Sequence, residues 1–190
     1  MLERLPNYKV NMGFGLHFGW GIEGAIGSPY KIDASYLSPN VNISARLEAA
    51  TRQYGVSILI SGELQDILTE QFQQITRLID IVTVKGSAVP MKFYTINLKL
   101  DCLEEVNAYF EGMSVKKRKE MRNEAKKDLK TKLHNDLITT EDLLKEDEDI
   151  SKMMGQHKSN EPEFKREYQA AFEKYIQGDW KGAYDVFKRC

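Results

Sequence analysis

Two polar side chains that could contribute to one binding site, Asn42 and Arg46, lie four residues apart in a segment of helical character. Residues at this spacing share one face of an α-helix, so the carboxamide and the guanidinium would be neighbours. Such a pair could form part of a site for a polar ligand. For an isolated pair, however, a solvated polar helix face is the favoured interpretation.

A glycine pattern, Gly19-Trp20-Gly21-Ile22-Glu23-Gly24, also matches a known chemistry, the dinucleotide-binding fingerprint GxGxxG. That fingerprint requires a helix to open at the glycines, so that its first amides face the pyrophosphate. Here Gly27, Ser28 and Pro29 follow within a few residues. We therefore interpret these glycines as hairpin positions rather than as a nucleotide site.

The helix that would carry Asn42 and Arg46 has clear limits in the sequence. Ser38 can cap its first turn, Pro39 suits the first helical position, and Gly55 ends the helix. The face expected to pack on the core consists of Val41, Ala45 and Ala49.

Residues 10–20 predict an unusual strand. Their apolar positions are Val10, Met12, Phe14, Leu16, Phe18 and Trp20, and the positions between them are Asn11, Gly13, Gly15, His17 and Gly19. A period of two places the two sets on opposite faces. We expect the apolar face to pack on helices, and the bare face to admit a backbone, a partner chain or a ligand. We expect Asn42 and Arg46 to project toward this bare face, and the strand to form a hairpin with residues 22–26.

The later elements of the first hundred residues complete a mixed fold. They are predicted as a strand at 56–60, a helix at 63–71, and a hairpin of strands at 78–84 and 92–98. This order predicts an α/β (α+β) domain of ferredoxin-like type. Because strands of such a domain are missing, its edges and core would stay open, which predicts marginal stability or dependence on a partner.

Charged residues divide the chain into regions. Residues 1–100 hold 17 of the 55 charged residues and 9 of the 13 glycines, whereas residues 101–190 hold the other 38 charged residues and 4 glycines. We predict an α/β domain at 1–100, a charged helical linker at 101–160 and a helical hairpin at 161–190.

Composition and charge exclude several classes of protein. A chain of 190 residues that is 42% hydrophobic and 29% charged is globular rather than collagen-like or disordered. Its net charge of −1 gives no overall attraction to nucleic acid, so no nucleic-acid partner is expected. Cys102 and Cys190 lie far apart and outside any ligand pattern, which favours a reducing, cytoplasmic setting over disulfides or zinc. No apolar run is long enough to span a bilayer, so direct membrane insertion is not expected.

The first region contains four ordered blocks. They are GLHFG at 15–19, EGAIG at 23–27, VNISARLE at 41–48, and VKG at 84–86 followed by Phe93 and Tyr94. In order and spacing they resemble the second half of a class III adenylate/guanylate cyclase catalytic domain. The segment YKIDASYLSPNVN at 30–42 is most similar to the cyclases of protists. The resemblance covers about residues 12–98.

The resemblance implies a reaction in intracellular signal transduction. In this family the ribose 3′-hydroxyl of ATP or GTP attacks its own α-phosphate, which yields a cyclic nucleotide and pyrophosphate. By motif position, Arg46 would stabilise charge on the reacting phosphate, because a guanidinium donates two bonds at once. Asn42 would orient the ribose for attack.

Two more residues are candidates for substrate binding by the same comparison. Asp33 could accept hydrogen bonds from a purine edge, although it lies nine residues before Asn42 and relatives commonly have this contact seven before, here Ser35. Lys85 could contact phosphate, although a lysine in a hairpin turn is usually just solvated.

The resemblance also implies a missing half. Family members bind Mg²⁺ or Mn²⁺ through two aspartates in the first half of the domain, which is absent here. We therefore expect no metal ligand from this chain, and expect the ligands from a second cyclase domain in a homo- or heterodimer. Asp80, in the string IDIV at 79–82, mimics the first metal motif, but it lies downstream of Arg46. We interpret it as an ordinary residue of the late hairpin.

The second half of the chain is predicted to be helical. Residues 116–132 hold nine basic and three acidic side chains, and residues 141–149 hold six acidic and one basic. A solvated basic helix face is the favoured interpretation, with RNA or lipid headgroups as the alternative. Residues 161–190 resemble one tetratricopeptide-type repeat, a helical hairpin broken at Gly178. One such repeat cannot bury its faces alone, so we expect it to dock elsewhere.

Two functions of different class remain open. In the favoured one, the chain is a fragment of a phosphorus–oxygen lyase that supplies Asn42 and Arg46 to a partner and is inactive alone. It would be cytoplasmic, or at the cytosolic face of a membrane as part of a larger cyclase. In the alternative, it is a catalytically inactive interaction or regulatory module that acts through its helical tail.

Overall fold

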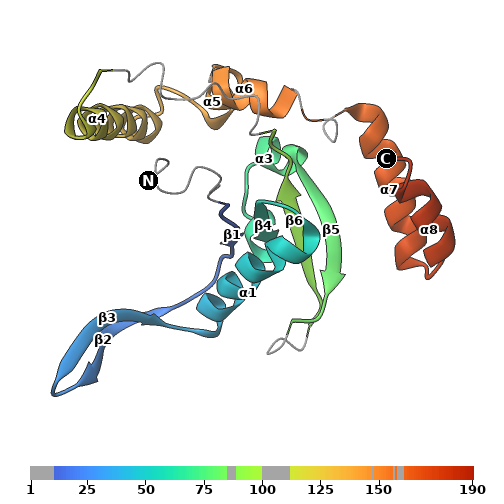
Figure 1. The fold of residues 1–190 in the computed structure, drawn as a ribbon, viewed down its shortest axis with the longest axis horizontal. Coiled ribbons are helices and arrows are strands. Elements are labelled where there is room, and N and C mark those ends of the chain that lie inside the picture. Colours follow the sequence, from blue (N-terminus) through green and yellow to red (C-terminus); the bar gives the residue numbers. More distant parts are fainter. Residues whose placement is uncertain (1–10, 85–88, 100–111, 147, 156, 158–160) are drawn as a thin grey trace. The chain divides into compact units, whose positions relative to one another are not determined.

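The computed structural model describes residues 11–84, 89–99, 112–146, 148–155, 157 and 161–190. The chain forms two compact units, Met1–Ile96 and Asn97–Cys190, and each is described by itself (Figure 1). The first is mixed α/β and the second is helical, which confirms the predicted fold class. The predicted boundaries at 100 and 160 lie among residues outside the described part, so they stay predictions.

A four-stranded sheet and one long helix organise the first unit. The sheet has the order β1-β4-β6-β5, with β1 parallel to β4 and the other neighbours antiparallel. Its elements, with the separate hairpin of β2 and β3, are β1 (Phe14–Leu16), β2 (Ile22–Ser28), β3 (Lys31–Leu37), α1 (Pro39–Tyr54), β4 (Ile58–Ser61), α2 (Gly62–Gln65), α3 (Glu70–Ile75), β5 (Thr76–Val82) and β6 (Met91–Ile96). The sheet and α1 enclose a small core of Leu47, Leu59, Met91 and Phe93.

Both ends of α1 are set by the residues expected from the sequence. The Ser38 side chain accepts a hydrogen bond from the Asn40 amide, and Pro39 is the first helical residue. At the other end Gly55 adopts a φ of 65°, in the left-handed region where a glycine has no steric penalty. The predicted limits of this helix are confirmed.

The buried face of α1 differs from the predicted one. Leu47 and Thr51 are buried, with Ile43, Ala50 and Tyr54 packed against the core beside them. The side chains expected to face the core, Val41, Ala45 and Ala49, are exposed. The prediction is wrong because small residues suit either face, whereas the larger Ile43, Leu47 and Tyr54 bury more apolar area.

Strand β1 packs on α1 through its glycines, not through its apolar side chains. A Cβ on Gly13 would overlap the Thr51 hydroxyl, and a Cβ on Gly15 would overlap the Ser44 carbonyl and the Glu48 amide. The backbone that the bare face admits is therefore that of α1.

The apolar side chains of the predicted strand point away from this helix and are 42–65% exposed. They are Met12, Phe14, Leu16, Phe18 and Trp20, and we call them the apolar face of β1. The prediction that this face packs on helices is wrong, because the missing side chains on the other face allow a closer helix approach. Val10 lies outside the described residues.

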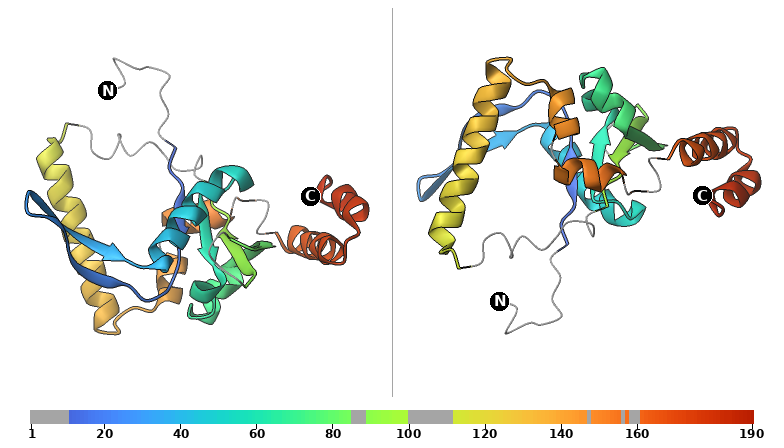
Figure 2. Two further views of the ribbon diagram at one scale, coloured as in Figure 1. Left: turned by 90° about the horizontal axis from the view of Figure 1, so that it is seen from below. Right: turned by 90° about the horizontal axis from the view of Figure 1, so that it is seen from above.

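The predicted hairpin of residues 10–20 with 22–26 is also wrong. β1 pairs with β4, whereas β2 pairs antiparallel with β3 in a register that includes Ile26 and Asp33. We call this two-stranded hairpin the arm. It extends away from the four-stranded sheet (Figures 1 and 2). All of β2 and most of β3 are exposed.

The later elements of the first unit largely follow the prediction. The strand near 56–60 is β4, and the late hairpin is β5 with β6. The single helix expected at 63–71 is instead two short helices, α2 and α3, because Ser61 caps the first and Thr69 begins the second.

The second unit consists of helices. They are α4 (Val115–His134), α5 (Thr140–Glu146), α6 (Glu148–Gly155), α7 (Pro162–Ile176) and α8 (Trp180–Phe187). The predicted helical hairpin is confirmed in α7 and α8, joined at Gly178 with a φ of 85°. A ladder of aromatic rings holds it, with Tyr168 stacked between Phe164 and Phe172 and also 5.3 Å from Phe187. The likeness to a tetratricopeptide repeat stays a prediction. None of the described helices has the length and apolar content needed to cross a lipid bilayer.

The contact between β1 and α1 predicts the effect of adding one methyl group. We expect Gly15→Ala to lower the free energy of unfolding by about 1–3 kcal/mol, since overpacking must push α1 off the strand. Gly24→Ala is the matched control, because no atom lies within 4 Å of a Cβ there, and its effect should stay within about 0.5 kcal/mol. Urea unfolding followed by circular dichroism measures both. Equal effects of the two substitutions would contradict this packing.

Candidate functional site

Asn42 and Arg46 lie on the first two turns of α1, on one face of the helix. At 3.6 residues per turn, they lie about 140° and 100° around the axis from the buried Leu47. Asn42 is exposed and Arg46 is half-buried. The pair is therefore adjacent, as the spacing predicts.

The direction of this pair differs from the expectation. The side of α1 that meets the glycines of β1 carries Ser44, Glu48 and Thr51. Asn42 and Arg46 lie away from that side, so the prediction that they project toward the glycine-lined face is wrong. The glycine face is already filled by the helix itself.

Neither side chain is used to hold the fold together. Within the described ranges, no hydrogen bond or ion pair is made by the Asn42 carboxamide or the Arg46 guanidinium. By contrast Arg52, also on α1, pairs with Glu48 at 3.2 Å. Asn42 and Arg46 are thus available to a ligand or to a partner.

The other two predicted substrate contacts do not join this pair in the described structure. Asp33 is exposed on β3 and pairs with Lys31 at 3.0 Å. It lies four residues before the end of the strand, so at a rise of about 3.3 Å per residue it is about 13 Å from the α1 end of the arm. Lys85 lies outside the described residues.

Asp80 has a structural setting on β5. The Tyr54 hydroxyl donates a hydrogen bond of 2.7 Å to its carboxylate, and the pairing of β5 with β6 shifts between Leu78 and Asp80. The Tyr54 ring in turn packs edge-on against Phe93, with centroids 6.1 Å apart. Asp80 therefore ties the sheet to the end of α1.

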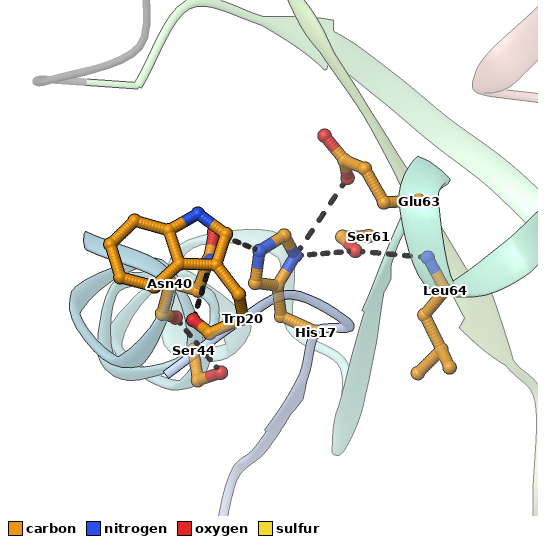
Figure 3. Close-up of polar contacts among 7 residues, drawn as sticks. All are labelled: His17, Trp20, Asn40, Ser44, Ser61, Glu63 and Leu64. Carbon is orange, nitrogen blue, oxygen red and sulfur yellow. Dashed lines mark hydrogen bonds and ion pairs between the residues drawn. The ribbon is translucent and has the colours of Figure 1, made fainter. Parts of the chain in front are cut away.

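His17 forms a polar cluster that the sequence did not reveal as a site. Its side chain is 3% exposed and lies between α1 and the junction of β4 with α2 (Figure 3). Nε2 is 3.0 Å from Asn40 Oδ1, and Nδ1 is 2.8 Å from Ser61 Oγ and 3.7 Å from Glu63 Oε2. One imidazole thus joins three elements of the first unit.

The same cluster holds the base of the arm. The Trp20 carbonyl accepts hydrogen bonds from Ser38 Oγ at 2.6 Å and from Asn40 Nδ2 at 2.8 Å. Gly19 permits this approach, because a Cβ there would overlap the Asn40 carboxamide. The start of α1 is therefore fixed from both sides by the chain that leaves β1.

One signal in the sequence could have indicated this cluster. His17 occupies the same face as Gly13 and Gly15, and that face packs on the helix. A lone histidine on a strand face otherwise made of small residues must be buried wherever that face is covered, and a buried imidazole needs hydrogen-bond partners.

The described part of the chain does not offer a metal site. No three His, Cys, Asp or Glu side chains among the described residues lie close enough to hold one ion. The residues present therefore do not fit the Mg²⁺ or Mn²⁺ that the cyclase resemblance implies, and no chemical step through a metal is derived from them.

A surface cavity of about 620 Å³ lies at the other end of α1. It is lined by Asn11, Met12, Gly13, Glu48, Thr51, Arg52, Gly55, Val56 and Ser57. Asn42 and Arg46 are not among its lining residues, so it is separate from the candidate pair.

Comparison with known proteins relates part of the chain to adenylate cyclases. It is 33% identical over 89 residues to an adenylate cyclase of Anabaena cylindrica, covering 46% of this chain and 18% of that protein. It is 31% identical over 89 residues to the terminal-differentiation-specific adenylate cyclase of Dictyostelium discoideum, covering 46% and 4%. A match to adenylate cyclase 1 of Rhizobium meliloti has 33% identity over 58 residues, 30% of this chain and 8% of that one.

A solved structure of a bacterial light-regulated adenylyl cyclase is also similar, with 33% identity, 45% of this chain and 23% of that chain covered, and a TM-score of 0.39. No model of a known protein family matches the sequence. The chain spans less than a fifth of the length of each of these curated relatives. It contains a cyclase-related region.

The absence of fold contacts at Asn42 and Arg46 can be tested by stability. We expect Asn42→Ala and Arg46→Ala to change the free energy of unfolding by no more than about 0.5 kcal/mol. Ser38→Ala on the same helix should cost about 1 kcal/mol, because it removes the cap. Urea unfolding measures all three, and a loss as large as that of Ser38→Ala in either of the first two would assign it to the fold.

Proposed function

We propose that this chain contributes to a nucleotide cyclase, supplying Asn42 and Arg46 to an active site shared with a second cyclase domain. One observation carries the proposal: an amide and a guanidinium lie one helical turn apart on an uncommitted face of α1, in a chain with a region related to adenylate cyclases. The substrate class is a nucleoside triphosphate, ATP or GTP.

The chemistry assigned to the pair follows from the reaction. The ribose 3′-oxygen forms a bond to the α-phosphorus, the bond from that phosphorus to the leaving pyrophosphate breaks, and the hydroxyl proton is lost. Negative charge builds on the phosphoryl oxygens, and the planar Arg46 guanidinium suits them because it donates two parallel hydrogen bonds. Asn42 holds the ribose in the attacking orientation, which lowers the entropic part of the barrier.

The partner completes what this chain does not offer. Mg²⁺ or Mn²⁺ would be held by aspartates of the second cyclase domain, in a homo- or heterodimer. Asp33 and Lys85 stay candidate contacts to the base and to phosphate. Because Asp33 lies well along the arm, its role requires the partner or the substrate to reach the arm.

The apolar face of β1 supports a partner in the first unit. Five apolar side chains of residues 12–20 are at least 42% exposed, and β1 is an edge strand of its sheet. An exposed edge beside exposed aromatic rings is costly for a protein that stays alone. We propose that the second domain covers this surface.

A specific observation also favours the alternative, a catalytically inactive interaction module. Trp180 and Tyr184 lie one turn apart on α8 and are 72% and 63% exposed. Large exposed aromatic rings are common in protein interfaces. In this case binding through the helical tail would be independent of Arg46.

Complementation tests the cyclase proposal. We expect the purified chain with Mn²⁺ and ATP or GTP to show no measurable turnover, and activity to appear when a separately expressed first half of a cyclase domain is added. Arg46→Ala should then reduce the rate by about 10²-fold or more, and Asn42→Ala by about 10²-fold.

Arg52→Ala is the matched control for this assay, because Arg52 is an exposed arginine on the same helix and should leave the rate unchanged. Cyclic nucleotide and pyrophosphate formation are measured together. Rescue that survives Arg46→Ala would reject the assignment, and turnover by the chain alone would contradict the need for a partner.

The proposed docking surface can be tested separately by binding. Phe14→Ser should weaken binding of the added half-domain by about tenfold, since a half-exposed aromatic side chain that becomes buried contributes about 1–2 kcal/mol. Val115→Ser, at an 81% exposed valine of α4, is the control and should leave the affinity unchanged. Titration calorimetry gives both dissociation constants, and equal affinities would place the partner elsewhere.

A further inference from the structure

We propose that His17 is a positioning residue: through Asn40 it sets the orientation of the first turn of α1, and thereby of Asn42 and Arg46. The inference rests on the proposed function for its effect on catalysis. Its structural part, the control of the start of α1 by one imidazole, stands on the contacts of His17 alone.

The start of a helix needs partners from outside the helix. Its first amides have no carbonyl one turn earlier, so external groups decide how the first turn is held. In α1 these groups are the Ser38 hydroxyl, which bonds the Asn40 amide, and His17, which bonds the Asn40 side chain. Asn42 follows Asn40 by two residues, so a shift of this turn moves its carboxamide directly.

Hydrogen-bond accounting assigns the direction of each contact. The Trp20 carbonyl can only accept, so the nitrogen of the Asn40 carboxamide must face it, at 2.8 Å. The Asn40 oxygen then faces His17 and can only accept, so His17 Nε2 carries a proton. The contact of His17 with Asn40 therefore holds in one orientation only.

The other imidazole nitrogen is held by the sheet side. Ser61 Oγ accepts from the Leu64 amide at 3.3 Å, and its own hydroxyl can donate to His17 Nδ1 at 2.8 Å. Ser61 is fully buried at the end of β4, and Glu63 lies 3.7 Å from the same nitrogen. Because β4 belongs to the central sheet, the imidazole transmits the position of the sheet to the start of α1.

A purely structural histidine would give a different mutational pattern. If His17 only filled space, any side chain of similar size would serve. If it positions Asn40, the group at the Nε2 place is decisive. Glutamine can place an N–H donor near that position, whereas asparagine is shorter and reaches only the Ser61 side.

The test compares His17→Gln with His17→Asn in the full chain. His17→Gln should retain activity with the added half-domain within about threefold, whereas His17→Asn should lower kcat by tenfold or more with little change in KM. Hydrogen exchange of the amides of residues 43–46 should accelerate about tenfold in His17→Asn and stay near the wild-type rate in His17→Gln. His134→Ala, at an exposed histidine of α4, should leave both readouts unchanged.

A second pair of variants covers the case in which His17→Asn does not fold. Gly19→Ala places a methyl group against the Asn40 carboxamide, and Gly21→Ala, whose Cβ would lie 3.8 Å from its nearest neighbour, is the control. Gly19→Ala should accelerate the same amides and Gly21→Ala should not. In the folded wild type, ¹⁵N spectra should show the imidazole protonated at Nε2.

The outcomes separate this inference from the proposed function. If the wild type stays inactive with the half-domain, the proposed function fails, and the exchange rates still decide whether His17 holds α1. Equal exchange in both His17 variants, equal exchange in both glycine variants, or a proton on Nδ1 alone would overturn the inference. Activity of His17→Asn equal to that of His17→Gln would overturn its catalytic part.

Discussion

The close approach of α1 to strand β1 is the contact on which the rest of the first unit depends. It is possible because Gly13 and Gly15 present no side chain where the helix backbone passes. Once the helix occupies this face, the alternating pattern leaves Phe14 and Leu16 pointing away from it. His17 lies on the helix side and becomes buried, with hydrogen bonds to both neighbours. A single packing choice thus creates both the exposed apolar face and the polar cluster.

The same choice determines which residues of α1 remain available for chemistry. Leu47 and Thr51 are used in the core, and Ser44 and Glu48 lie against the glycine strand. The remaining surface of the first two turns carries Asn42 and Arg46. A site built on this surface has no opposing wall from α1 or β1, which is consistent with the proposal that a second domain provides it.

The arm and the helical tail extend this dependence on partners in different ways. A two-stranded hairpin without a packed face is marginally stable by itself, and the arm is anchored at its base through the Trp20 carbonyl. The helical hairpin of α7 and α8 has its own aromatic ladder, yet it leaves Trp180 exposed. Surfaces of both units are therefore better suited to contacts than to solvent.

The sequence by itself determined the local features of this protein. Ser38, Pro39 and Gly55 set the limits of α1, the spacing of Asn42 and Arg46 made them neighbours, and the four motif blocks indicated the cyclase relationship, because these signals depend on residues close together in the chain. Only the tertiary structure decided which face of each element is covered. It reversed the expected faces of β1 and α1 and paired β1 with β4 rather than with β2, since alternation defines two faces without saying which one a helix will approach. The His17 cluster likewise joins residues 23 and 44 positions apart, which local patterns cannot bring together.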